Sequence, residues 1–153
     1  MTKKRTKQQK LSDQFDAFKC MQKGVPVKRQ GRKDGYIPTK PTVLVPDLPE
    51  SEVLKQCMTH LRAIGIMCNR NNTGSGDIHG TGQIYRYGIA GGGDIIGLLP
   101  TGKHLEIEAK KGKGGLLSPE QQRRKVDIET NNGIYLIVHG VAEISLLLQL
   151  HGV

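Results

Sequence analysis

The chain is 153 residues long, with 36% hydrophobic residues and a formal net charge of +9. This length and composition suffice for one domain with a modest core. No run approaches the roughly 18 apolar residues that a membrane span needs, and the basic N-terminus lacks the apolar stretch of a secretory signal. The three cysteines form no CxxC pair, which favours a reducing compartment. We therefore expect a cytoplasmic protein with no membrane association.

The positive charge is concentrated in the N-terminal part of the chain. Residues 1–40 hold twelve Lys or Arg and three Asp, whereas residues 41–153 hold eleven residues of each sign. A segment of this kind is attracted to polyanions, and counterion release makes its nucleic-acid affinity depend on salt. A solvated tail that only improves solubility is the alternative. We predict that residues 1–46 form a basic arm and linker, with a short amphipathic helix over residues 12–22.

The rest of the chain, residues 47–153, is predicted to be one α/β domain. Hydrophobic periodicity and turn residues predict a helix from Asp47 or Pro49 to Gly65, then a strand over 66–69. A glycine-rich stretch follows over 70–93, with a small ribbon over 83–87. The later elements are a hairpin (94–99 and 103–110), a helix opened by Ser118 and Pro119, a strand (134–138) and a helix (142–150).

This order of helix, three strands, helix, strand and helix predicts a small mixed β-sheet flanked by helices. The strand over 134–138 follows a helical crossover, so we expect it to pair in parallel with an earlier strand. Gln121 occupies the N3 position after Ser118, which is the arrangement of a capping box.

Charged residues gather on one face of the second hairpin strand. Leu105, Ile107 and Ala109 alternate with charged neighbours, so Glu106, Glu108 and Lys110 project from the same face. Asp94, on the other side of the hairpin turn, adds a further carboxylate to this group. Two ionised carboxylates about 4 Å apart cost on the order of 4 kcal/mol at an effective dielectric constant near 20. A divalent cation would supply the missing counter-charge. A surface strand with ordinary salt bridges is the alternative interpretation.

Oxygen ligands of this kind suit Mg²⁺ or Mn²⁺. Such an ion can polarise a phosphoryl group and lower the pKa of an attacking water. Lys110 lies on the same strand face and can hold that water or stabilise negative charge that develops on phosphorus.

Five short segments together carry a resemblance to a known family. Asp94 followed after a hairpin by Glu108-Ala109-Lys110 resembles the PD-(D/E)XK nuclease signature, with Gly93 in place of the proline. When four further segments are considered with this signature, the chain resembles the VRR-NUC branch, particularly its small stand-alone forms from bacteriophages and bacteria. Those segments are Glu52 in the first helix, Arg70-Asn71-Asn72-Thr73-Gly74, Gly93-Asp94-Ile95-Ile96-Gly97, and Leu117-Ser118-Pro119-Glu120-Gln121. The resemblance covers roughly residues 48–145 and leaves the basic arm unmatched.

The resemblance implies a restriction-endonuclease-like core and a catalytic set of Asp94, Glu108, Lys110 and Gln121. Asp94 and Glu108 would bind Mg²⁺ or Mn²⁺ together with the main-chain carbonyl of Ala109. Lys110 would position or activate the water, and Gln121 would orient Lys110 or the water.

The remaining metal ligand is left open by the sequence. The resemblance implies that Glu52 completes the metal shell, but Glu50 is close enough in sequence to compete, and Glu106 shares a strand face with Glu108. Acidic residues in a first helical turn also favour the helix dipole, so capping is an equal alternative for Glu50 and Glu52.

The expected function is metal-dependent hydrolysis of DNA phosphodiester bonds by an endonuclease that acts on structured or duplex DNA. The expected partners are DNA, including branched DNA, and a second copy in a homodimer. Candidate nucleic-acid contacts are Lys3, Lys4, Arg5, Arg70, Lys111 and Lys113. Two alternatives stay open: a non-catalytic nucleic-acid-binding module, and a ribonuclease.

Overall fold

The computed structural model describes residues 6–8, 18–19, 22, 24 and 35–153. The chain divides into two units, residues 1–35 and residues 36–153, and the second unit contains all the elements discussed below. The predicted helix over 12–22 lies largely outside the described residues, and Lys3, Lys4 and Arg5 lie wholly outside them. Among the described residues, no helix combines the length and the apolar character needed to cross a membrane.

The central feature of the second unit is a four-stranded sheet in the order β2-β5-β6-β8. Its strands are β2 (Met67–Arg70), β5 (Ile95–Leu98), β6 (His104–Ala109) and β8 (Ile134–Val138). The first three pair antiparallel, and β8 pairs in parallel with β6, with Ile107 opposite Leu136. The predicted hairpin and the predicted parallel strand are therefore both confirmed.

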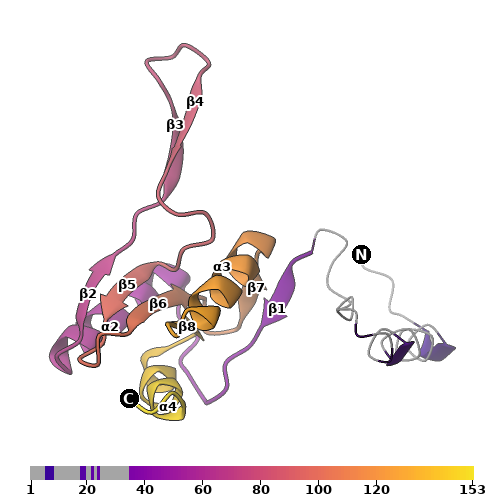
Figure 1. Ribbon diagram of the computed structural model, residues 1–153, viewed down its shortest axis with the longest axis vertical. Coiled ribbons are helices and arrows are strands. Elements are labelled where there is room, and N and C mark those ends of the chain that lie inside the picture. The colour runs from indigo at the N-terminus through magenta and orange to yellow at the C-terminus, as the bar shows by residue number, and fades with distance from the viewer. Residues whose placement is uncertain (1–5, 9–17, 20–21, 23, 25–34) are drawn as a thin grey trace. The chain divides into compact units, whose positions relative to one another are not determined.

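Three helices accompany this sheet: α2 (Glu50–Ala63), α3 (Pro119–Thr130) and α4 (Val141–Leu150). Helix α2 ends where Gly65 adopts a φ of 80°, a conformation that glycine accepts at little cost. Helix α3 begins with the predicted capping box, because the Ser118 hydroxyl accepts from the Gln121 N–H and the Gln121 side chain accepts from the Ser118 N–H. The mixed α/β class is confirmed by these elements (Figure 1).

The two faces of the sheet have different coverings. On one face, the apolar residues of β6 and β8 pack against α2 and α4 in a single core. The contributions of the helices include Val53, Cys57 and Leu61 of α2, which recur at helical spacing, and Ile144 and Leu148 of α4. On the other face, Glu106 and Glu108 of β6 are bonded to side chains of α3. The charged face of β6 is thus buried beneath a helix rather than exposed to solvent.

One part of the predicted linker is a strand. Residues 37–39 form β1 (Ile37–Thr39), which pairs antiparallel with β7 (Gly115–Leu117). The compact unit accordingly begins at Tyr36, whereas we drew the boundary at residue 47. Pro38 and a length of three residues hide this strand in the sequence, and proline is tolerated because β1 lies at a sheet edge.

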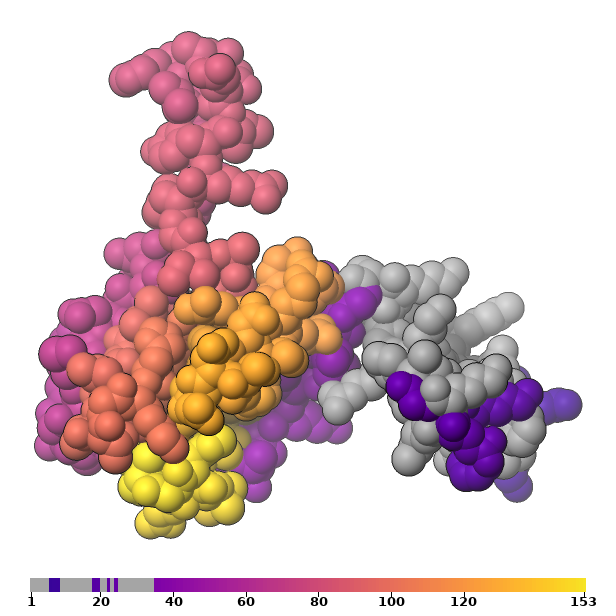
Figure 2. Space-filling view, viewed as in Figure 1, coloured from indigo at the N-terminus to yellow at the C-terminus, as the bar shows by residue number. Residues whose placement is uncertain are grey.

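The predicted ribbon is an antiparallel hairpin of β3 (Gly74–Asp77) and β4 (Ile84–Tyr87). It forms a separate two-stranded sheet and projects from the body of its unit (Figures 1 and 2). The glycine-rich stretch that we predicted to be a long loop with a ribbon therefore contains a longer hairpin than expected.

Candidate active site

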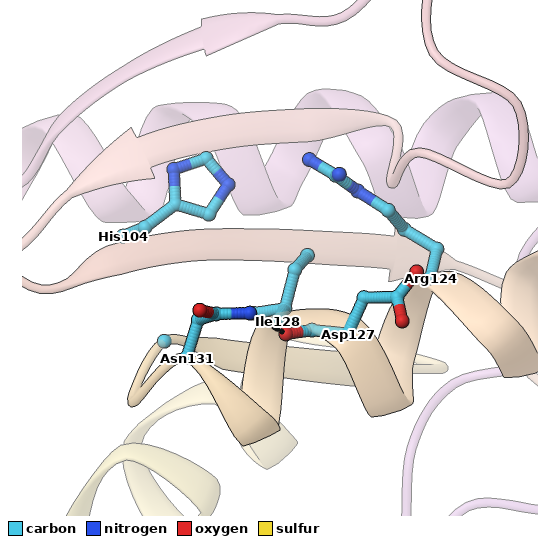
Figure 3. A pocket seen from close by; sticks show the side chains of 6 residues that line it. His104, Arg124, Asp127, Ile128 and Asn131 are labelled. Carbon is cyan, nitrogen blue, oxygen red and sulfur yellow. Dashed lines mark hydrogen bonds between the residues drawn. The ribbon is translucent and has the colours of Figure 1, made fainter.

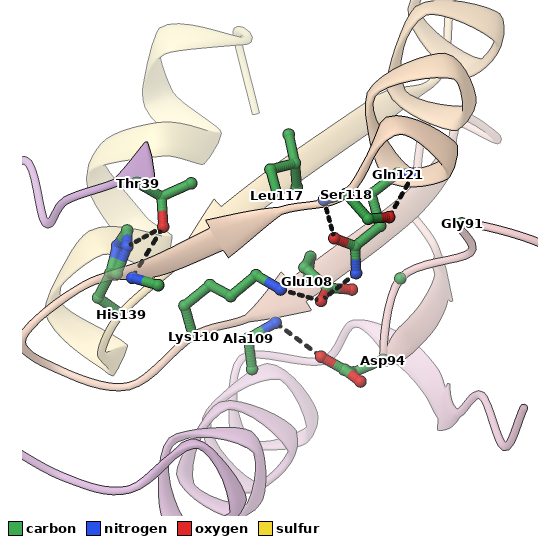
Figure 4. A network of polar contacts seen from close by, with 12 residues as sticks. Thr39, Gly91, Asp94, Glu108, Ala109, Lys110, Leu117, Ser118, Gln121 and His139 are labelled. Carbon is green, nitrogen blue, oxygen red and sulfur yellow. Dashed lines mark hydrogen bonds and ion pairs between the residues drawn. The ribbon is translucent and has the colours of Figure 1, made fainter. Parts of the chain in front are cut away.

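The two carboxylates predicted to bind metal come together at the start of β5 and the end of β6. Asp94 directly precedes β5, and the pairing of Ile95 with Ile107 places it beside Glu108. The Ala109 N–H donates to Asp94 Oδ2 over 2.9 Å, which fixes this carboxylate against the β6 backbone. Figure 4 shows the Lys110 ammonium directed at the Glu108 carboxylate and the Asp94 carboxylate directed at the Ala109 N–H.

Lys110 and Gln121 both donate to the same oxygen of Glu108. The distance to Glu108 Oε1 is 2.6 Å from Lys110 Nζ and 2.5 Å from Gln121 Nε2. Glu108 and Lys110 are 4% and 7% exposed, so this ion pair is shielded from water. Strand β7 covers the lysine, since a Cβ on Gly115 would lie 3.0 Å from Lys110 Cδ. The capping box of α3 also holds Gln121, so one side chain closes a helix and orients a carboxylate.

The electrostatics of this pair differ from those of ordinary surface carboxylates. Burial and, to a smaller extent, the charge of Asp94 together raise the pKa of Glu108 to about 7, because Lys110 offsets only part of their effect. Burial also raises the pKa of Asp94, against the opposing hydrogen bond from Ala109 and the charges of Lys110 and Arg70. Burial is the largest cause of both shifts, and neighbouring carboxylates with raised pKa values are found most often at functional sites.

The donor atoms of this site fit Mg²⁺ or Mn²⁺. Among the described residues, no group of three or more His, Cys, Asp and Glu side chains is arranged to hold a metal ion. Asp94, Glu108 and the carbonyl of Ala109 nevertheless match the habit of Mg²⁺, which binds through one or two carboxylates and keeps several waters for substrate phosphates to replace. A bound cation would favour the ionised form of both carboxylates and lower their pKa values.

The two acidic residues of the first turn of α2 have different surroundings. The charge of Glu50 raises the pKa of Glu108, so its carboxylate lies within electrostatic reach of the site. Glu52 Oε1 instead accepts from Gln56 Nε2 on the same helix, over 3.1 Å. Glu50 therefore acts electrostatically on Glu108, whereas the hydrogen bond of the predicted Glu52 is to its own helix.

Asn71, which we named from the sequence only as part of a family segment, and Tyr135, which we did not name, hold the loop before Asp94. The Asn71 N–H donates to the Asp94 carbonyl over 2.7 Å, and Asn71 Nδ2 donates to the Gly93 carbonyl. The Tyr135 hydroxyl donates to the Gly91 carbonyl. Asn71 follows directly after a strand, and Tyr135 is the one aromatic residue in an aliphatic strand. Each was visible as a polar exception in the sequence, but nothing there identified its partner.

Glu106 takes no part in the carboxylate pair, although it shares a strand face with Glu108. Its Oε1 is 2.5 Å from Arg124 Nη2, and its Oε2 accepts from the Gly93 N–H over 3.0 Å. Burial raises its pKa, but the hydrogen bonds from Arg124 and Gly93 outweigh burial and lower the pKa overall. Glu106 is therefore a satisfied buried anion that anchors α3 and the loop before Asp94.

The pocket beside Glu106 has a volume of about 280 Å³. Figure 3 shows His104 on β6 and the side chains of α3 that line it. Two of these residues, His104 and Arg124, are themselves bonded to Glu106. The pocket thus lies near Glu106, at the end of β6 where His104 begins the strand. Asp94 and Glu108 are not among its lining residues.

The predicted nucleic-acid contacts within the second unit surround the site unevenly. Arg70 is exposed at the end of β2, and its charge reaches Asp94. Lys111 is exposed directly after Lys110. Lys113 is exposed and pairs with Asp47 at 2.8 Å. Arg70 therefore acts electrostatically on the carboxylate pair, Lys111 is next to Lys110 in sequence, and Lys113 already has an acidic partner.

Comparisons of the chain with protein-family models, with curated proteins and with solved structures found no match.

Proposed function

We propose that this protein is a metal-dependent nuclease that hydrolyses DNA phosphodiester bonds. The observation that carries the proposal is the convergence on Glu108: one carboxylate oxygen accepts from Lys110 and Gln121, beside an Asp94 whose charge raises the Glu108 pKa. A purely structural salt bridge does not need a second, half-buried carboxylate placed beside it. A catalytic metal site does.

The side chains divide the work as follows. Asp94 and Glu108, with the Ala109 carbonyl, would hold Mg²⁺ or Mn²⁺, which neutralises phosphate charge and lowers the pKa of water when bound. The Lys110 ammonium is anchored on Glu108, and it can donate further hydrogen bonds to the attacking water or to a phosphate oxygen. Gln121 fixes the orientation of Glu108, and through it that of Lys110.

The resemblance to PD-(D/E)XK nucleases, and to their VRR-NUC branch, is part of this proposal. Two observations support it. Asp94, Glu108, Ala109, Lys110 and Gln121 follow one another in the order of the signature. The elements that carry and surround them follow the chain as α2, β2, β5, β6, α3, β8 and α4, with the four strands in one mixed sheet. Gly93 replaces the proline of that signature, and its N–H binds Glu106. Proline has no N–H and could not make this hydrogen bond, so the glycine at position 93 lets the backbone donate to the buried Glu106 carboxylate.

Cleavage assays with matched lysine variants test the proposal. Purified protein is incubated with Mg²⁺ or Mn²⁺ and a panel of linear, nicked, flapped and four-way DNA, with RNA of the same sequences. We expect Lys110→Ala to reduce cleavage by about 10²-fold or more. The control Lys125→Ala, which removes only an exposed pair with Glu129 on α3, should cleave normally. Equal activity of the two variants would refute the role of Lys110.

The same panel separates the alternative functions. A non-catalytic binding module would bind DNA through its basic residues and cleave no substrate with either metal. A ribonuclease would cleave the RNA strands only. The buried Lys110–Glu108 pair favours the enzyme, because a binding module gains nothing from an acidic site that repels phosphate.

Homodimerisation belongs to the proposal as a means of cutting two strands, since paired cuts need two sites. Analytical ultracentrifugation of the protein, free and bound to uncleaved DNA, tests it. A monomer in both conditions would mean that one site acts on one strand at a time.

A further inference from the structure

The β3–β4 hairpin carries two tyrosines on one face, opposite two glycines. Tyr87 lies opposite Gly74 and Tyr85 opposite Gly76 in the register of the ribbon. A Cβ on Gly74 would lie 2.4 Å from the Tyr87 hydroxyl, and one on Gly76 would lie 3.1 Å from a ring carbon of Tyr85. Each ring therefore lies across the facing strand in space that only glycine leaves open.

These two rings form an exposed aromatic platform. Tyr85 and Tyr87 are 46% and 51% exposed, with ring centroids 6.1 Å apart. One side of each ring rests on a glycine backbone, so the other side is offered to solvent. Exposed, adjacent aromatic rings are a common feature of surfaces that bind a partner by stacking.

A concave site adjoins the platform near the turn of the hairpin. A pocket of about 500 Å³ is lined by Asp77, Ile78, His79 and Tyr85. It offers an aromatic ring and an aliphatic side chain for stacking, and a carboxylate and an imidazole for hydrogen bonds. This combination suits a flat heterocycle with polar edges.

The hairpin is attached at the candidate active site. Its first strand follows Asn71, whose N–H binds the Asp94 carbonyl. Its second strand leads through Gly91 to Gly93, and both Gly91 and Gly93 are held by hydrogen bonds at the same place. Arg70 and Arg86 carry positive charge near this base, within electrostatic reach of Asp94 and Glu120, respectively. The platform thus extends from the residues that position Asp94.

We propose that the tyrosine ribbon, residues 74–87, stacks unpaired bases of the DNA substrate, so that the preferred substrate has a single-stranded segment beside the cleaved bond. This inference rests on the proposed nuclease function. Aromatic side chains bind bases of any sequence through their ring faces. Among residues 70–93 only Asp77 is acidic, against Arg70 and Arg86, so little repels phosphate along the ribbon.

Fluorescence anisotropy of labelled DNA, measured in EDTA so that nothing is cleaved, tests the ribbon. The probes are a blunt duplex and the same duplex with a single-stranded tail. Because alanine substitution of a stacking aromatic costs about 1–3 kcal/mol per base, we expect Tyr85→Ala and Tyr87→Ala each to weaken tailed-duplex binding by about tenfold. Blunt-duplex binding should change by less than about twofold.

Three further variants sharpen this result. Tyr87→Phe keeps the ring and should bind normally. Gly74→Ala keeps both tyrosines but puts a methyl group where the Tyr87 ring lies, so it should weaken tailed-duplex binding. Ile84→Ala removes a large exposed side chain from the opposite face of the ribbon and should have no effect.

Equal weakening on both probes, or none on either, would overturn the inference. The inference would also be overturned if the tyrosine variants bound DNA as the wild type does but sedimented with a lower mass, because the ribbon would then contact a second copy of the chain. Because binding is measured without metal, its outcome is independent of cleavage. If binding depended on the tyrosines but the protein cleaved no substrate, the proposed nuclease function would be refuted and the proposed role of the ribbon in DNA binding would stand.

Discussion

Glu106 and Glu108 lie two residues apart on one face of β6, but their surroundings are opposite. Glu106 is neutralised by Arg124 and has a lowered pKa, whereas Glu108 lies beside Asp94 and has a pKa raised to about 7. The alternation of β6 predicted that both carboxylates share a face. It could not tell them apart, because Arg124 is 18 residues from Glu106 in sequence and reaches it only after α3 docks.

This contrast predicts opposite effects of the same substitution. In the metal-free protein at pH 8, Glu108→Gln removes an anion whose ionisation is disfavoured even with Lys110 beside it, so the free energy of unfolding should rise by about 1–3 kcal/mol. Glu106→Gln leaves Arg124 without its buried partner, so the free energy of unfolding should fall by about 2 kcal/mol. Urea unfolding in EDTA measures both changes. A loss of stability in both variants would show that Glu108 is only structural.

The raised pKa of Glu108 also fixes the direction of a pH effect. A carboxyl group whose pKa is higher in the folded state binds more protons when folded, so stability falls as pH rises from about 4.5 to about 7. We expect this fall in wild-type protein in EDTA and its absence in Glu108→Gln. A Glu108→Gln profile parallel to that of the wild type would contradict the assignment.

Among the helices and strands, the sequence predicted the elements with long or well-marked patterns but missed the shortest strands. The apolar stripe of α2, the capping box of α3 and the apolar run of β8 each fixed an element in advance. Strand β1 has three residues, one of them Pro38, and its ladder partner β7 follows a turn almost eighty residues later. No local pattern encodes such a pairing. The same limit applies to the site, where Glu50 reaches Glu108 only through tertiary packing.

Strand β1 and the segment after it are held by a buried polar network on α4. Glu143 accepts from the Thr42 N–H and hydroxyl and from the N–H of His139, and His139 Nε2 lies 3.0 Å from Thr39 Oγ1. Figure 4 shows the Thr39 and His139 contact beside Lys110. Burial alone would raise the pKa of Glu143, but these hydrogen bonds outweigh it and lower the pKa.

The network predicts a loss of stability in acid. A carboxyl group with a lowered folded pKa stabilises the fold at pH values above about 4.5, and this contribution is lost as pH falls through the folded pKa. Glu143→Gln should therefore lower the free energy of unfolding by about 2 kcal/mol at pH 7, and the difference from wild type should shrink by pH 3. Urea unfolding at the two pH values checks this, and a difference independent of pH would contradict it.

At the scale of the whole molecule, the two units have different charge. The twelve Lys and Arg of residues 1–40 include only one, Lys40, that lies beyond residue 35. The structure also changes how the arm must be removed. A deletion through residue 40 would remove β1 and the Thr39 contact with His139, so the informative deletion ends at residue 34.

Deletion of residues 1–34 should flatten the salt dependence of DNA binding. Each phosphate contact contributes about 0.9 to the slope of log affinity against log salt, so loss of arm contacts lowers the slope in proportion. Binding isotherms at several salt concentrations give both slopes, and Mn²⁺ binding by calorimetry shows that the metal site is retained. An unchanged slope would mean that the arm does not touch the phosphates.

The central claim is that Asp94 and Glu108 form a metal site that cleaves DNA. Its most direct test is the cleavage of end-labelled DNA with a single-stranded tail by the full-length protein and by Asp94→Asn, in Mg²⁺ and in EDTA. We expect cleavage by the wild-type protein in Mg²⁺, none in EDTA, and at least about a 10²-fold loss in Asp94→Asn. Cleavage by Asp94→Asn at the wild-type rate, or no cleavage by the wild-type protein, would contradict it.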